Sequence, residues 1–269
     1  MVAGRIEAQS PGLGLSVPAG LWLIGAPLGA DAAELARVPG VSGIICGPKA
    51  DVRALCDAFG AKGLVSAPGG PARRNLVGQV PARETPPKGK AFHARGICSP
   101  ARLDASLEAW LGGLEGQKGE LTSCLALFGV DAIRLDRTFD AIALQRMDGA
   151  PTDFIRAAYR LLLGRVGTAV AAVCRRRLAT AVNGARFKAL ARRGAPRPVL
   201  LVEAAAAKAA EFAAPDTLVA VPYEAAVSLP PLPAGSALDE AYDASKGLLD
   251  KLANYQIDLD VIAGELEAA

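Results

Sequence analysis

The sequence predicts an α/β fold with a parallel sheet, and the architecture that fits best is a (β/α)8 barrel. Eight short apolar segments alternate with helical stretches, and this alternation indicates parallel strands joined by βαβ units. Eight strands within about 250 residues is the usual size of such a barrel, so we expect one domain over residues 1–269. Composition favours a doubly wound sheet almost as strongly, and that fold is the alternative.

The first half of the chain predicts five strands and three helices. The strands are expected at residues 20–26, 41–46, 63–67, 75–80 and 90–98. Helices are expected at Asp31–Val38, Asp51–Phe59 and Ser99–Leu114, with Asp31 and Ser99 as N-caps because both side chains accept hydrogen bonds from a first helical turn. The connection 68–74 is rich in glycine and proline and too short for a proper helix.

The second half predicts three more strands and five helical stretches. The strands are expected at residues 121–130, 198–202 and 217–221. The helices are expected at residues 131–147, 152–163, 167–190, 237–252 and 259–268. Asp131 directly follows a strand, and we interpret it as a helix cap.

Composition excludes several classes of function. The net charge of +3 and the aromatic content of 5% argue against nucleic acid as the main partner. The single histidine excludes a multi-histidine metal site, and we expect neither metal nor cofactor. Five cysteines without a C-x-x-C pair indicate reduced thiols, and hence an intracellular protein. We expect no membrane span, and a cytoplasmic location with a mitochondrial or plastid one as the alternative.

Several segments, in the same order, resemble those of a known family. Residues 186–208 read RFKALARRGAPRPVLLVEAAAAK, residues 214–222 read APDTLVAVP, and residues 256–267 read QIDLDVIAGELE. They are similar to the transaldolase patterns "ALAAKGA", "GPDTVNTMP" and "GIDLDAVTAELE". Residues 99–131 and 21–48 match further segments. The chain therefore resembles transaldolases, the Schiff-base (β/α)8 aldolases of the pentose phosphate pathway, over nearly its whole length.

The resemblance implies that the catalytic residues of the family are missing. The strand motif "NLMIKVPA" reads NLVGQVPA here, so Gln79 stands at the position of the nucleophilic lysine, and an amide cannot form an imine. The third-strand glutamate falls near Pro68. The other family positions that have lost their functional side chain are Ile24, Gly47, Gly129 and Ala204. The segments after the third and fourth strands are shorter than in the family, which implies a degenerate barrel with shortened helices there.

Several cationic residues are candidates for a different role. Lys49 and Lys208 follow strands and could act as relocated nucleophiles, although a solvated loop lysine is the simpler interpretation of each. Lys49 is also a candidate for anion or partner binding. His93 and Arg95 fall on the fifth-strand asparagine and threonine of the family, and are candidates for anion or partner binding. The run of Arg175, Arg176 and Arg177 indicates either contact with an acidic partner or a solvated helix face.

Two further segments complete the domain, and the first of them includes the strand expected at residues 75–80. Residues 69–90 form a Pro/Gly-rich, basic loop region, and loops of this composition often dock on a partner. Residues 1–16 are expected to be an N-terminal extension. Together with the lost catalytic positions, these features predict a catalytically inactive, transaldolase-like structural or accessory subunit of a larger protein assembly. The alternatives are a sugar-phosphate-binding regulator and a divergent Schiff-base aldolase.

Overall fold

Eight parallel strands close into a barrel in chain order, because each strand pairs with the next and β1 also pairs with β8. The structure is a computed structural model, and it describes residues 21–25, 31–37, 40–60, 63–69, 75–87, 90–226, 229, 232–233 and 235–268. The strands are β1 Leu21–Ile24, β2 Val41–Ile45, β3 Leu64–Ala67, β4 Leu76–Pro81, β5 Phe92–Ile97, β6 Ala126–Asp131, β7 Val199–Glu203 and β8 Thr217–Pro222. The closed sheet confirms the (β/α)8 prediction over the doubly wound alternative.

The helices follow the expected alternation over most of the chain. They are α1 Ala32–Leu35, α2 Val52–Phe59, α3 Pro100–Glu115, α4 Ala132–Asp148, α5 Asp153–Arg160, α6 Val166–Asn183, α7 Ala185–Ala191, α8 Tyr223–Ala226, α9 Ala237–Glu240, α10 Tyr242–Leu252 and α11 Leu259–Ala268, with 3-10 turns η2 Ala206–Phe212 and η3 Ala253–Tyr255. The three predicted caps are confirmed. The side chains of Asp31, Ser99 and Asp131 accept from backbone N–H groups at 2.8, 3.2 and 2.9 Å.

The barrel is filled by residues that alternate along each strand. On β7, Val199 and Leu201 face the interior, whereas Leu200 and Val202 belong to the cluster between the barrel and its helices. The interior cluster consists of Trp22, Ile45, Leu64, Val77, Leu125, Leu127, Val199, Leu201, Leu218 and Ala220. These are mostly large apolar side chains, so the barrel is a packed core without a central pore.

Three sequence predictions differ from the structure in their boundaries. The strand expected from Leu121 begins at Ala126, because the preceding residues form a turn in which the Cys124 N–H donates to the Leu121 carbonyl at 3.0 Å. The helix expected over 167–190 is two helices, since Gly184 adopts an extended backbone conformation between them. The helix expected over 237–252 is also divided, into α9 and α10.

The connections after β3 and β4 contain no helix among the residues that the structure describes there, which are 68–69, 75, 82–87 and 90–91. The N-terminal extension 1–16 and two parts of the loop region 69–90, residues 70–74 and 88–89, lie outside the described residues. Near β4, α3 packs over the chain, and the Ser106 hydroxyl donates to the Ala82 carbonyl at 3.2 Å. Helix α3 therefore contacts the segment that leaves β4.

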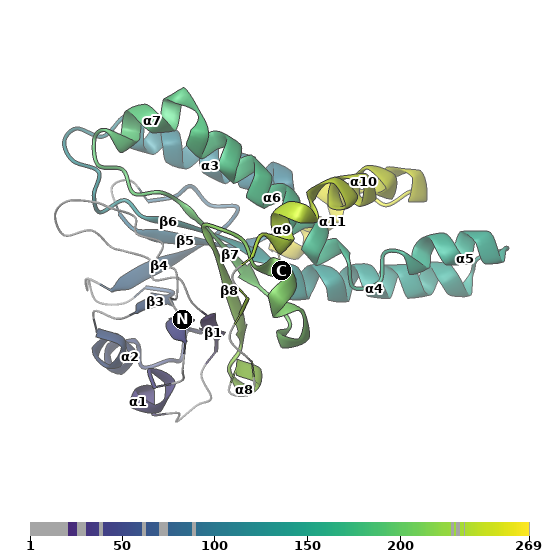
Figure 1. The fold of residues 1–269 in the computed structure, drawn as a ribbon, viewed down its shortest axis with the longest axis horizontal. Helices are drawn as coiled ribbons and strands as arrows, with labels where there is room; N and C mark the ends of the chain where they lie inside the picture. Colours follow the sequence, from purple (N-terminus) through teal and green to yellow (C-terminus); the bar gives the residue numbers. More distant parts are fainter. Residues whose placement is uncertain are drawn as a thin grey trace.

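The helices are distributed unevenly around the barrel (Figure 1). Helices α3, α6 and α7 lie together on one side, while α4 and α5 run side by side away from the strands, toward the right of the figure. Helix α10 packs against α6, and Tyr255 after it meets Tyr159 of α5 with ring centroids 5.7 Å apart. The α4–α5 hairpin is therefore held at its base and extends beyond the barrel.

The fit of Trp22 against Gly43 inside the barrel can be tested. A Cβ at Gly43 would lie 2.3 Å from the Trp22 ring, which is completely buried. We expect Gly43→Ala to lower the free energy of unfolding by about 1–3 kcal/mol, the usual cost of overpacking a core. Urea denaturation measures this difference. Gly78→Ala in β4 is the matched control, because a Cβ there meets nothing within 4 Å; an equal loss in both variants would contradict the prediction.

Candidate functional site

Polar side chains gather at the carboxyl ends of the barrel strands, where parallel barrels place their binding and catalytic residues. Gln79 lies on β4, Arg95 on β5, Asp131 at the end of β6 and Glu203 at the end of β7. Asp131 and Glu203 are neighbours in the β6–β7 register. Four strands therefore bring charged or amide groups to the same end of the barrel, which we call the mouth.

The carboxamide of Gln79 links neighbouring strands at the mouth by hydrogen bonds. Its Nε2 atom donates to the carbonyl oxygens of Cys46 and Ser66, both at 2.9 Å. Because an amide nitrogen carries two protons, these two bonds use its full donor capacity. Gln79 thus links the ends of β2, β3 and β4, and its side chain has a structural task of its own.

His93 lies inside the barrel below the mouth and is completely buried. Its Nδ1 atom is 2.8 Å from the Ser66 hydroxyl, and its Nε2 occupies the space that a side chain at residue 129 would need. A Cβ at Gly129 would lie 2.3 Å from Nε2. Burial, together with the charge of Arg95, lowers the pKa of His93 to about 3. The imidazole is therefore neutral at neutral pH and supplies no positive charge for an anion.

Arg95 forms a bidentate ion pair with Glu203. Its Nε and Nη2 atoms lie 2.9 and 3.1 Å from the two carboxylate oxygens. The Glu203 side chain is only 5% exposed, and burial raises its pKa, while the hydrogen bonds and charge of Arg95 act in the opposite direction. The pKa of Arg95 is raised, since pairing with Glu203 outweighs the burial that opposes it. The guanidinium is thus already neutralised by a carboxylate of the same chain.

A cavity of about 360 Å³ opens beside these residues. Gln79, Arg95, Asp131, Arg134 and Glu267 are its polar and charged lining residues. The Arg134 backbone N–H donates to Asp131, but its guanidinium has no ion pair or hydrogen bond within the described part of the chain. The two carboxylates in the wall balance the two guanidinium groups in charge.

Helix α11 closes one side of this cavity through Glu267. One carboxylate oxygen accepts from the Cys98 backbone N–H at 3.3 Å, and the other accepts from Arg102 Nε at 2.6 Å. Glu267 is only 4% exposed. The last helix is therefore fixed to the start of α3, beside the mouth.

The remaining positions of the expected family site carry no group that could react. Ile24 is half-buried and packs against the interior cluster, and Ala204 is buried in the layer between barrel and helices. Gly47 is exposed after β2, and Pro68 is exposed after β3. With Gln79 and Gly129, all these residues lie at or near the ends of strands, as the sequence predicts.

The two candidate lysines lie apart from the cavity lining. Lys208 is in η2, where its ammonium group forms an ion pair with Asp136 at 2.6 Å and donates to the Gly164 carbonyl. Lys49 is exposed in the turn after β2. The amine of Lys208 is thus committed to other elements of the fold.

The arginine run on α6 is used mainly within the chain. Arg175 is buried and pairs with Asp239 at 3.5 Å, while Arg177 pairs with Asp104 of α3. The Arg176 guanidinium lies over the Tyr242 ring, 5.6 Å from its centroid. These contacts join α6 to α3, α9 and α10, so the run serves as a junction between helices.

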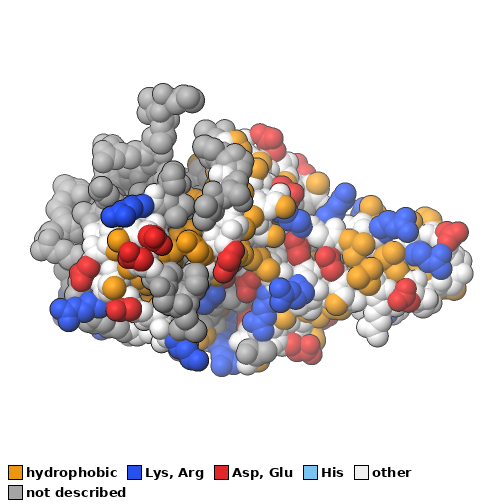
Figure 2. All heavy atoms as spheres, turned by 90° about the horizontal axis from the view of Figure 1, so that it is seen from below, with side chains coloured by type: hydrophobic (Ala, Val, Ile, Leu, Met, Phe, Trp, Pro, Cys, Tyr) orange, Lys and Arg blue, Asp and Glu red, His pale blue; other side chains and the backbone are white. Residues whose placement is uncertain are grey.

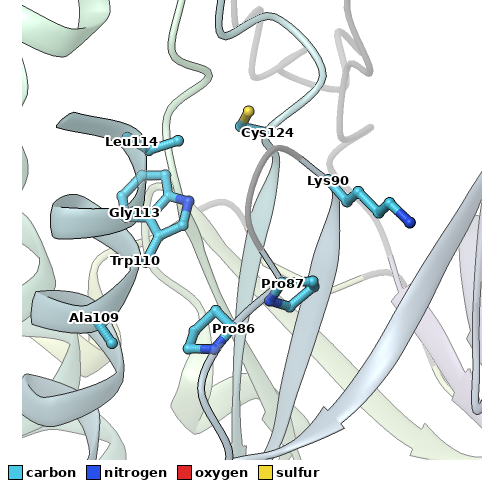
Figure 3. A pocket seen from close by; sticks show the side chains of 8 residues that line it. All are labelled: Pro86, Pro87, Lys90, Ala109, Trp110, Gly113, Leu114 and Cys124. Carbon is cyan, nitrogen blue, oxygen red and sulfur yellow. The ribbon is translucent and has the colours of Figure 1, made fainter. Parts of the chain in front are cut away.

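A second hollow lies beside the loop that follows β4 (Figure 3). Pro86 and Pro87 lie across it from Trp110 of α3, Cys124 lies near Leu114, and the Lys90 side chain points away from α3. Its volume is about 10 Å³, roughly the space that a single water molecule needs. It is therefore too small for a substrate, and it marks where the proline-rich segment packs against α3.

The cysteines are free and buried. Burial raises the pKa of the Cys46 and Cys98 thiols to about 12, so neither is a thiolate nucleophile at neutral pH. The described residues contain no group of three or more histidine, cysteine or acidic side chains arranged to hold a metal ion. In the described part of the chain, no helix is both long and apolar enough to cross a bilayer.

Comparison with known proteins adds no assignment, because neither a family model nor a curated protein sequence matches the chain. The transaldolase resemblance is therefore an argument from the residues quoted above. What the coordinates add independently is the closed parallel barrel and the grouping of polar residues at its mouth.

Sequence reasoning missed four residues of the mouth. Glu203 directly follows the predicted strand 198–202, and the alternation of Val199 and Leu201 could have placed it inside the barrel. Ser66, Arg134 and Glu267 gave no comparable signal. Their place at the site depends on how strands and helices from distant parts of the sequence come together.

The buried imidazole predicts a pH dependence of stability. The pKa of His93 is about 3 in the folded chain, against an ordinary value of 6.5. As the pH falls below 6.5, the imidazole therefore becomes protonated in the unfolded chain but stays neutral in the folded chain, which favours unfolding. We expect a loss of about 2 kcal/mol from this group between pH 7 and pH 5. Urea unfolding of wild type and His93→Gln at both pH values measures it.

His93 is the only histidine, so its NMR signal gives a second readout in wild type. We expect the ring protons not to titrate between pH 8 and pH 5. A titration near the ordinary pKa, or an equal pH dependence of stability in His93→Gln, would contradict the burial argument.

Proposed function

We propose that this chain is a transaldolase-like barrel without Schiff-base catalysis, which serves as a structural or accessory subunit of a larger protein assembly. The observation that carries the proposal is that Gln79, at the position expected for the lysine, uses its carboxamide in hydrogen bonds to the backbone. Its Nε2 donates to two strand carbonyls at 2.9 Å and braces the mouth. A carboxamide at this place provides no amine for a ketose carbonyl, so the covalent route of the family has no starting point.

The other groups at the mouth support the same proposal. The imidazole of His93 fills the space beside Gly129, and Arg95 is paired with Glu203. Their polar groups are thus committed to partners within the chain, and removing one partner of the buried ion pair would be destabilising. In this proposal, the barrel retains its rigid core and its outer helices as surfaces for other subunits.

The divergent aldolase alternative would need Lys49 or Lys208 as nucleophile. Lys208 Nζ is held by Asp136 and the Gly164 carbonyl, and neither lysine lines the cavity. A lysine nucleophile requires a free, deprotonated amine next to the substrate carbonyl. The arrangement of Lys208 therefore favours an ion pair that joins η2 to α4.

Borohydride trapping tests the loss of catalysis. We expect no covalent adduct when the purified chain is treated with a ketose phosphate and sodium borohydride, because Gln79 cannot form the reducible imine. Intact-mass spectrometry measures the adduct, and an active transaldolase is the positive control. An adduct that disappears in Lys49→Arg or Lys208→Arg would overturn the proposal in favour of the divergent enzyme.

A sugar-phosphate-binding regulator is the second candidate, favoured by the cavity itself. Its volume of about 360 Å³ suits a small ligand, and Arg134 reaches its wall without a side-chain partner among the described residues. The carboxylates of Asp131 and Glu267 line the same cavity and would repel a phosphate. This balance of charges favours the accessory role over the regulator.

Thermal shift separates these two functions. A ligand present at a hundredfold excess over its Kd stabilises a folded protein by about 2.7 kcal/mol. We expect pentose and hexose phosphates to leave the Tm unchanged, since two cations and two anions line the cavity. A rise of several degrees that disappears in Arg134→Gln would favour the regulator. Lys118→Gln, on an exposed loop, is the control for the loss of one positive charge.

A further inference from the structure

The α4–α5 hairpin, residues 132–165, carries an apolar surface that nothing in the described chain covers. We call this hairpin the arm. Phe154 is 85% exposed, Leu144 51%, Leu161 49% and Ile155 36%. Helix α5 has apolar and polar faces like a core helix, yet it contains no buried residue. Seen from below, hydrophobic side chains gather along the arm, with basic and also acidic side chains around them (Figure 2).

The apolar residues have the spacing of a helix-binding surface. Phe154 and Leu161 are seven residues apart, and Leu144 lies on α4, which packs against α5. Residues one or two turns apart share a helix face, so Phe154 and Leu161 project from the same side of the chain at α5. We call the exposed residues Leu144, Phe154 and Leu161 the apolar seam, a surface that a third helix could cover. A phenylalanine that is 85% exposed on a soluble helix is more typical of a binding anchor than of a solvated surface.

The arm is rigid at its base and at its tip. Asp140 accepts from the Gly164 N–H at 2.6 Å, and Asp136 accepts from the Gly167 N–H at 2.7 Å. At the tip, Arg156 donates to the Met147 and Ala150 carbonyls, both at 3.4 Å, and so ties α5 to the end of α4. Arg156 also pairs with Asp153 at 2.6 Å. The apolar seam is thus held in place before a partner arrives, which lowers the entropy cost of binding.

Most of the charged side chains of the arm that have no ion-pair partner are positive. Asp136 and Asp153 form ion pairs with Lys208 and Arg156, whereas Asp140 accepts from a backbone N–H and keeps its negative charge. The exposed cations Arg137, Arg146, Arg160 and Arg165 have no side-chain partner in the part of the chain that the structure describes. Asp148 is the exposed anion left against them. The apolar seam is therefore bordered by unpaired positive charge.

We propose that the arm docks an amphipathic helix of another subunit, one with apolar anchors flanked by glutamate or aspartate. Acidic residues would pair with the free arginines while the apolar anchors cover Phe154 and Leu161. This inference rests on the proposed accessory role and identifies the surface and the partner chemistry for it.

The charges favour this occupant over the alternatives. A second copy of the arm would bring four more unpaired arginines against the first four, and like charges repel. An anionic bilayer would also attract these arginines, but it would have to take up Phe154 together with the adjacent Asp153, whose side chain is 95% exposed. An acidic helix satisfies both the apolar seam and the cations.

A synthetic peptide tests the proposal with the full-length protein. The probe is a fluorescent amphipathic helix with leucines spaced three and four residues apart and glutamates on the flanks. We expect saturable binding by fluorescence anisotropy that weakens as salt rises. Phe154→Ser with Leu161→Ser should weaken binding about tenfold or more, the size of effect seen for buried aromatic anchors. Both residues are exposed, so the variants should keep the wild-type Tm.

Charge reversal provides the sharper result. Arg137→Glu with Arg160→Glu should lose the glutamate peptide and gain a matched lysine peptide. Arg53→Glu with Arg192→Glu changes the net charge equally on α2 and after α7, away from the arm, and should behave as wild type (Figure 1).

Four outcomes would overturn the proposal. They are no binding of the glutamate peptide by wild type, equal binding by the Arg137→Glu/Arg160→Glu variant, preferential binding to phosphatidylserine vesicles, and a Phe154-dependent dimer by light scattering. Each concerns the arm alone. The borohydride adduct is measured at the barrel, so failure of the arm and failure of the non-catalytic role give different results.

Discussion

The ion pair between Arg95 and Glu203 is the contact on which the mouth of the barrel depends. A carboxylate with 5% exposure is stable only when a cation and hydrogen bonds replace its water. The pair joins β5 to β7 across β6, so it also fixes the ends of three strands. Because two of its three guanidinium nitrogens are used for this, most of the donor capacity of Arg95 serves the fold.

In the barrel interior below the mouth, two large rings pack against glycines. Trp22 occupies the space beside Gly43, and His93 occupies the space beside Gly129. A glycine inside a barrel leaves room that a neighbouring strand must fill, since cores are packed at crystal-like density. The absence of a side chain at Gly129 is therefore matched by the position of the only histidine. The interior is thus filled by the side chains of the barrel itself.

The positive charges of the molecule divide into two groups. Arginines 175 to 177 and Arg186 meet acids or an aromatic ring on neighbouring helices, with Arg186 at 2.5 and 2.7 Å from Glu108 and Glu115. Arg137, Arg146, Arg160 and Arg165 of the arm have no such partners in the described chain. A sequence shows both groups as basic helical stretches. Only the packing of α6 against α3, α9 and α10 shows that the first group joins helices, whereas the second group lies on an exposed surface.

The sequence by itself determined the alternation of strands and helices and the three caps, because hydrophobic period and capping chemistry are local properties. It predicted the barrel ahead of a doubly wound sheet, and the closed sheet decided between the two. The sequence also placed Gln79 at the end of a strand. Tertiary structure decided what that residue contacts, since the carbonyls of Cys46 and Ser66 lie 33 and 13 residues away. It likewise decided that Glu203 meets Arg95, at a separation of 108 residues, and that Phe154 stays exposed. Closing the barrel brings distant residues together, and no local pattern encodes those distances.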